Sequence, residues 1–177
     1  MLRADREGSA PGTGARVHLC DVPRQRLRIA PSRTVLVTAL GVLVVDAASK
    51  AWARRTLTRP VHVLGPLWLR LQYNTGISFS LNRSGPLVTT VVTTVVALAL
   101  LVAAVRARNG APAVGFGLML GGGVANVVDR LMATPHQVTD FIAVGSFPVF
   151  NAADVAVTCG FVVLIVVAMR GDTLMRR

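Results

Sequence analysis

Residues 85–105 read GPLVTTVVTTVVALALLVAAV and contain no charged side chain. A helix of about 20 apolar residues is long enough to cross the ~30 Å hydrocarbon core of a bilayer. Three further segments of this character lie at about 34–53, 111–131 and 149–169. A transmembrane barrel would need an alternating pattern over about ten residues per strand, and none is visible. The sequence therefore predicts an all-α membrane protein with four transmembrane helices.

The composition supports this fold class and argues against binding to nucleic acid. Hydrophobic residues make up 53% of the 177 residues, and the mean hydropathy is +0.58, above an average soluble domain. The formal net charge is +11, but the basic residues gather beside the apolar segments. That placement marks topology in membrane proteins. We therefore expect membrane lipid, and no nucleic acid, as a partner.

The chain divides into three parts. Residues 1–33 are rich in Arg, Gly and Pro, which predicts a disordered, Arg-rich cytoplasmic tail. Residues 34–170 form the predicted four-span domain, and residues 171–177 form a second cytoplasmic tail. Within the domain, residues 60–84 alternate partly and include a Trp and a Tyr. These features predict short strands in a small extracytoplasmic, β-rich segment.

The arginines set the expected orientation. Both tails and the connection after the second span carry arginines, and four spans place these three regions on one side. The count of arginines near the spans favours the cytoplasm for that side. Residues 60–84 and the connection at 132–148 then lie outside. We therefore expect a multi-pass protein of the plasma membrane with both termini in the cytoplasm.

Four of the eight acidic residues fall in or beside the predicted spans, at Asp46, Asp129, Asp140 and Asp154. An ionisable group inside a membrane is costly and often marks a functional site. With the expected topology all four approach the outer leaflet, where a site would open to one side. Asp154 is expected about five residues, or ~7 Å, below the outer end of its helix.

Most of these carboxylates also have structural interpretations. Asp46 and Lys50 are four residues apart on one helical face, so they can form an ion pair. Asp129 stands beside Arg130, which offers a salt bridge at a helix end. Asp140 could cap a short outer turn. Asp154 has the weakest structural explanation, because no basic residue lies within four positions of it in an apolar segment.

The sequence offers few other candidate catalytic or metal-binding residues. The histidines are scattered, and no HExxH motif or Cys/His cluster supports a metal site, so we expect neither metal nor cofactor. Ser78 and Ser80 lack a nearby histidine base, which leaves a Ser–Lys pairing with Lys50 open. Cys159 is expected to be a small buried hydrophobe. The glycines at 121–123 lie in a span and are expected to permit close helix packing.

Two carboxyls facing each other across a water provide a complete hydrolytic mechanism. One carboxylate takes a proton from the attacking water, while the other carboxyl, still protonated, donates a hydrogen bond to the developing oxyanion. Like charges at close range favour such sharing of one proton.

Five local motifs, in order along residues 34–170, resemble the lipoprotein signal peptidase (signal peptidase II) family. They are DAASK at 46–50, YNTGISFS at 73–80, GGGVANVVDR at 121–130, VTDFI at 138–142 and FNAAD at 150–154.

The resemblance implies a membrane aspartic peptidase with Asp140 and Asp154 as its catalytic dyad. It also implies a set of supporting and substrate-binding residues, which are Asp46, Lys50, Asn74, Gly76, Asn126, Asp129, Arg130 and Asn151. The implied substrates are bacterial prolipoproteins that carry diacylglyceryl on a cysteine and are cleaved just before that cysteine. We expect a monomer. The chain departs from the family motifs at Ser78, Ala125 and Thr139, where Ala, Gly and Val are usual.

Three further alternatives stay open on the sequence. Asp129 could replace Asp140 in the dyad, although Arg130 and Asn126 offer it local partners that favour the ionised form. A small multi-span transporter or proton-conducting protein would also use intramembrane carboxylates. A non-catalytic assembly subunit would tolerate replacement of Asp154 by Asn.

Overall fold

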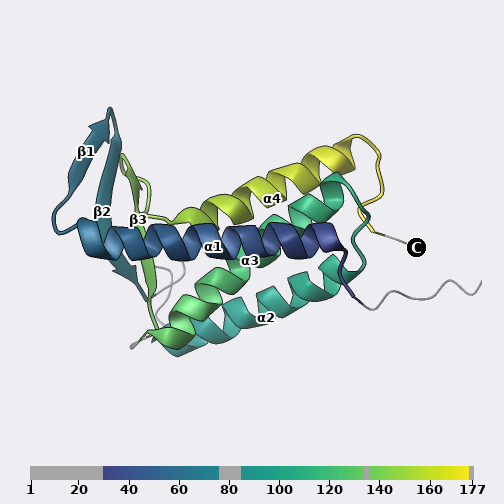
Figure 1. The fold of residues 1–177 in the computed structure, drawn as a ribbon, viewed down its shortest axis with the longest axis horizontal. Coiled ribbons are helices and arrows are strands. Elements are labelled where there is room, and N and C mark those ends of the chain that lie inside the picture. The colour runs from purple at the N-terminus through teal and green to yellow at the C-terminus, as the bar shows by residue number, and fades with distance from the viewer. Residues whose placement is uncertain (1–29, 76–84, 134–135, 176–177) are drawn as a thin grey trace, which may run out of the picture.

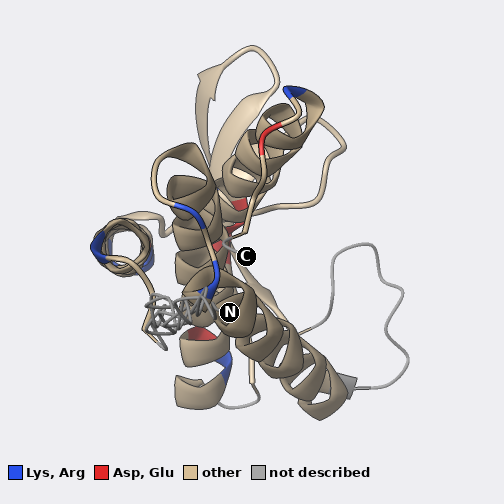
Figure 2. Cartoon of the chain, turned by 90° about the vertical axis from the view of Figure 1, so that its right-hand side faces the viewer, with Lys and Arg blue, Asp and Glu red and all other residues tan. Residues whose placement is uncertain are grey.

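The computed structural model describes residues 30–75, 85–133 and 136–175. Within this part of the chain, four helices form a bundle (Figure 1): α1 (Arg33–Thr56), α2 (Gly85–Val105), α3 (Ala111–Met132) and α4 (Ala152–Met169). All four are long and apolar enough to cross a membrane, and few of their residues carry a charge (Figure 2). The predicted fold class is confirmed. Gly76, Ser78 and Ser80 lie outside the described residues.

Helix α3 is the centre of the bundle, and each of its three consecutive glycines faces a different helix. A Cβ on Gly121 would lie 2.7 Å from the carbonyl oxygen of Ala39 in α1. One on Gly122 would collide with the carbonyl oxygen of Ala153 in α4. One on Gly123 would meet the side chains of Ala97 and Leu100 in α2, each at an ordinary 3.8 Å. The expectation of close packing is therefore confirmed for α1 and α4, whereas α2 packs less tightly.

A three-stranded antiparallel sheet covers one end of the bundle (Figure 1), with the order β1–β2–β3. The hairpin of β1 (Val61–Leu64) and β2 (Leu67–Asn74) lies in the segment where strands were predicted. Strand β3 (Val138–Val144) was not predicted, and the suggestion that Asp140 caps a turn is wrong. The first four residues of β3 are all buried, so the sequence lacks the alternation that identifies a half-exposed strand.

Helix α4 begins three residues later than the apolar pattern suggests, because Asn151 caps it. The Asn151 Oδ1 accepts a hydrogen bond from the Asp154 backbone N–H at 3.0 Å. The Asp154 Oδ2 accepts one from the Asn151 backbone N–H at 3.1 Å. This capping box corrects the expected depth of Asp154, which lies in the first turn of α4 rather than well inside it.

Candidate active site

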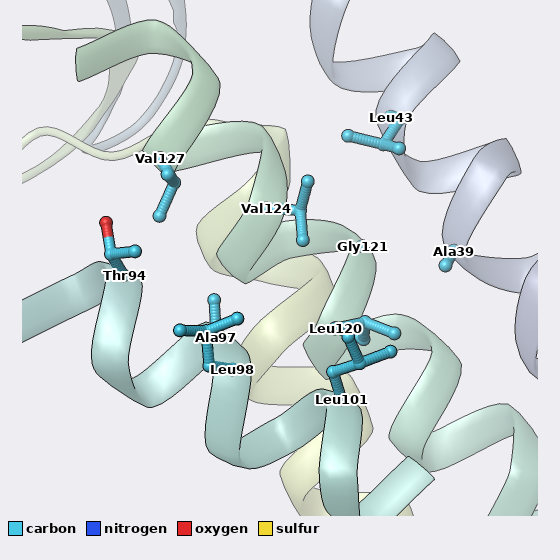
Figure 3. Close-up of a pocket in the computed structure, with 10 residues that line it drawn as sticks. All are labelled: Ala39, Leu43, Thr94, Ala97, Leu98, Leu101, Leu120, Gly121, Val124 and Val127. Atoms are coloured by element: carbon cyan, nitrogen blue, oxygen red, sulfur yellow. The ribbon is translucent and has the colours of Figure 1, made fainter. Parts of the chain in front are cut away.

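Two cavities lie on either side of α2, and they differ in chemistry. The smaller, about 290 Å³, lies between α1, α2 and α3 and has an almost wholly apolar lining (Figure 3). Its one hydroxyl, on Thr94, donates to the Thr90 carbonyl at 2.7 Å. The larger cavity, about 760 Å³, is lined by residues of α2, α3, α4 and the sheet. Its lining includes Asn74, Asn126, Arg130, Asp140 and Asp154, so it is the candidate site.

The larger cavity continues from these polar groups along apolar side chains of α2, α3 and α4. Leu100, Met119 and Cys159 contribute to this apolar part. Cys159 is exposed, so the expectation that it is buried is wrong. In a membrane helix an apolar segment can face lipid or a cavity, and hydrophobicity alone does not indicate burial within the protein.

Asn151 holds the carboxyls of Asp140 and Asp154 next to each other. Its side-chain Nδ2 donates to Asp140 Oδ1 at 2.7 Å, and its backbone N–H donates to Asp154 Oδ2 at 3.1 Å. The second oxygen of each carboxyl also accepts from an amide. Asn74 Nδ2 donates to Asp140 Oδ2 at 3.1 Å, and Asn126 Nδ2 donates to Asp154 Oδ1 at 2.8 Å. Both carboxyls are thus fixed by neutral donors at the wall of one cavity.

The environment of Asp140 favours a proton on that carboxyl. Its side chain is 1% exposed, and this burial raises the pKa of Asp140 to about 6. The neighbouring Asp154 carboxylate contributes to the rise in pKa. The hydrogen bonds from Asn74 and Asn151 and the charge of Lys50 act in the opposite direction. Burial and a like charge are the conditions under which two carboxyls share a proton.

A separate cluster of charges lies behind the cavity, centred on the buried Lys50. The Lys50 Nζ lies 2.6 Å from Asp46 Oδ2 and 2.9 Å from Asp129 Oδ2. The predicted pairing of Asp46 with Lys50 is therefore confirmed. The partner of Asp129 differs from the one expected, because Arg130 Nη1 donates instead to the Asn126 carbonyl oxygen at 3.3 Å. Adjacent residues of a helix point in different directions, which separates the two side chains.

Asn126 connects the charged cluster to the carboxyl pair. Its Oδ1 accepts hydrogen bonds from Lys50 Nζ and from Asn151 Nδ2, each at 3.2 Å. An ammonium group is a donor only, so it requires the amide oxygen of Asn126 to face it. The amide nitrogen then faces Asp154 and donates to it. Lys50 therefore fixes the orientation of the Asn126 amide, and so directs its nitrogen toward Asp154.

The structure brings together all of the predicted site residues that it describes; Gly76 alone lies outside the described part. Lys50 is engaged by two carboxylates, an arrangement that does not favour its use as the base of a Ser–Lys pair. Sequence reasoning did not single out Arg54, whose Nη1 donates to Thr139 Oγ1 at 2.9 Å beside Asp140. The available signal was its spacing, four residues after Lys50 on the same helical face.

Known proteins resemble this chain in sequence and fold. The family model for signal peptidase (SPase) II matches residues 38–170. Curated lipoprotein signal peptidases from two organisms illustrate the sequence similarity. The one from Mycobacterium avium is 34% identical and is aligned over 89% of this chain and 89% of its own length. The one from Chlorobium phaeobacteroides is 41% identical over 71% of this chain and 89% of its own length.

The fold agrees with the sequence similarity. A solved bacterial membrane enzyme superposes with a TM-score of 0.68 at 25% identity, covering 82% of this chain and 99% of its own. The family model covers three of the four helices and the whole sheet, together with most of α1. The chain belongs to the signal peptidase II family.

Proposed function

We propose that this chain is a membrane aspartic endopeptidase that removes signal peptides from diacylglyceryl-modified prolipoproteins, with Asp140 and Asp154 as its catalytic residues. One observation carries the proposal: a single asparagine, Asn151, binds both carboxyls at the wall of the large cavity. Family membership supports signal peptide removal and favours hydrolysis over the transport alternative. Beyond signal peptide removal, we propose that Asp140 and Asp154 are the catalytic residues and that they activate a water molecule.

The proposed reaction needs one proton shared by the two carboxyls. The ionised carboxyl takes a proton from a water molecule while the oxygen of that water attacks the peptide carbonyl. The protonated carboxyl donates a hydrogen bond to the developing oxyanion, and a proton then passes to the leaving amine. The raised pKa of Asp140 supports this scheme, because it keeps a proton available closer to neutral pH. The proton belongs to the pair, and we assign it to neither residue alone.

The shape of the cavity supports a substrate anchored in lipid. Its polar groups lie near the sheet, and its apolar part runs along three helices that are long enough to span a membrane. A diacylglyceryl group would occupy the apolar part while the adjacent peptide bond reaches Asp140 and Asp154. We place the sheet on the extracytoplasmic side and both termini in the cytoplasm. Alkaline phosphatase fused after Arg177 should be inactive in cells, and an active fusion would reverse this orientation.

The catalytic assignment is tested with purified Asp140→Asn and Asp154→Asn variants and a diacylglyceryl-modified prolipoprotein. Each variant should lose at least about a thousandfold in kcat, because an amide can neither ionise nor supply the shared proton. Asp172→Asn is the matched control, since Asp172 is exposed at the other end of the bundle. In detergent, all three variants should elute like the wild type and unfold cooperatively on heating, which shows that they are folded. Full activity of either site variant would remove that residue from the mechanism.

A further inference from the structure

Strand β3, which carries Asp140, is fastened to the helices through the preceding residue. Thr139 is 4% exposed. Its backbone N–H donates to Asp129 Oδ2 of α3 at 3.2 Å, and its hydroxyl accepts from Arg54 Nη1 of α1 at 2.9 Å. Successive side chains of a strand point to opposite faces. The hydroxyl contact of Thr139 therefore holds β3 from the face opposite to the one on which Asp140 meets Asn151, while its backbone N–H binds Asp129 in the plane of the sheet.

Arg54 completes a row of charged residues along one face of α1. Asp46, Lys50 and Arg54 recur every four residues, and each contacts a different element. Asp46 Oδ1 accepts from the Ala153 backbone N–H at the start of α4 at 2.9 Å. Lys50 binds α3 through Asp129. Arg54 binds β3 through Thr139. The row thus connects α1 to α3, β3 and α4, which carry most of the candidate-site residues.

We propose that Arg54 is a positioning residue that fixes Asp140 through the Thr139 hydroxyl; this inference rests on the proposed role of Asp140. A buried hydroxyl without a partner costs free energy, so Thr139 stays where Arg54 can reach it. Displacement of a reacting group by about 1 Å can lower a rate by about a hundredfold. Neither Arg54 nor Thr139 is among the described residues that line the cavity, so substrate binding should not depend on them directly.

The test is a double-mutant cycle in the full-length protein. Thr139→Val and Arg54→Leu should each lower kcat about tenfold, because β3 then shifts at Asp140, while KM stays within about twofold. The double variant should be no slower than the slower single variant, because both substitutions remove the same hydrogen bond between Arg54 and Thr139. Thr139→Ser keeps the hydroxyl and should retain kcat within about twofold of the wild type. A merely structural role would lower the melting temperature without this separation of kcat from KM and without rescue by Ser.

Arg55→Leu is the matched control, because Arg55 is the adjacent arginine of α1, is exposed like Arg54, and its side chain makes no hydrogen bond with the described residues. It should have wild-type kcat. A wild-type kcat in both Thr139→Val and Arg54→Leu, or additive losses in the double variant, would overturn the role of Arg54. Asp140→Asn, assayed alongside, separates the two proposals. An active Asp140→Asn contradicts the catalytic assignment, whereas an inactive one beside a normal Arg54→Leu contradicts only the positioning role.

Discussion

Two pairs of aspartates lie close together at the sheet end of this bundle, and their surroundings differ in one respect. Asp46 and Asp129 share the Lys50 ammonium between them, at 2.6 and 2.9 Å. Asp140 and Asp154 share Asn151, a neutral residue. The first pair therefore has a cation that compensates its charge where it is buried. Within the described part of the chain, the second pair accepts its hydrogen bonds from neutral amides, and Arg130 and Lys50 act on it through their charge.

This difference suggests a structural role for the pair bound to Lys50 and a proton-transfer role for the pair bound to Asn151. A buried carboxylate paired with an ammonium stays ionised and holds helices together, because breaking the pair leaves an uncompensated charge. A carboxyl held only by amides keeps its affinity for a proton, and burial increases that affinity. Under the proposed mechanism, aspartates compensated by Lys50 hold the helices together, whereas aspartates held by Asn151 take part in the reaction. The predictions that follow change these central residues and the amides around them.

The largest effect on stability is expected from Lys50→Met, which removes the cation from the first pair. Lys50 is 1% exposed, and its loss leaves Asp46 and Asp129 facing each other without compensation. The free energy of unfolding should fall by about 3–5 kcal/mol. Thermal unfolding in detergent measures it, with Arg55→Met as an exposed control on the same helix. A Lys50→Met protein that melts like the wild type would show that the cluster does not hold the bundle together.

Asn126→Leu should have the next largest effect, and mainly on activity. It leaves Lys50 with both carboxylates but removes the donor to Asp154 Oδ1. An Asp154 carboxyl that keeps the hydrogen bond from the Asn151 backbone N–H but loses the one from Asn126 is less well oriented for catalysis, so kcat should fall about 10- to 100-fold. Stability should fall by only about 1–3 kcal/mol, the usual cost of a buried donor left unpaired. If stability falls as far as in Lys50→Met, Asn126 belongs with the charged cluster rather than with the carboxyl pair.

The raised pKa of Asp140 predicts how stability depends on pH. Burial and the neighbouring Asp154 raise the pKa of Asp140 from 3.8 to about 6, so the folded carboxyl pair should keep a proton up to about pH 6. The folded state therefore binds more protons between these values, and stability from this group is lost as the pH rises through about 6. The melting temperature of the wild type should fall between pH 4 and pH 7 relative to Asp140→Asn, by roughly 5 °C. Parallel melting curves for the two proteins would contradict the raised pKa.

The sequence predicts the four spans and the pairing of Asp46 with Lys50 because both depend on local spacing. Apolar runs of sufficient length and residues four apart on a helix are visible without tertiary information. Strand β3 and the true start of α4 are not predictable in this way. The burial of β3 on both faces removes its alternation, and the end of the apolar run does not reveal the cap at Asn151. The partner of Asp129 depends on how α1 packs against α3, which no spacing within α3 could indicate.

The smallest and most specific effect is expected from Asn74→Leu. Asn74 Nδ2 donates to Asp140 Oδ2 and thereby favours the ionised form, which lowers the pKa of Asp140. Without this donor the pKa of Asp140 should rise, by less than about one unit for one hydrogen bond. Because the reaction needs a shared proton, kcat/KM of the wild type should fall as the pH rises through about 6, and in Asn74→Leu this fall should begin at higher pH.

Gln72→Leu provides the matched control for this shift. Gln72 lies two residues before Asn74 on the same strand, and its side chain is exposed. Its variant should keep the wild-type midpoint of the alkaline limb. The direction of the shift tests whether Asp140 sets the alkaline limb. If another group set that limb, the loss of the Asn74 donor would leave it unchanged. An unchanged limb in Asn74→Leu would therefore show that the proton on which the reaction depends is not held at Asp140.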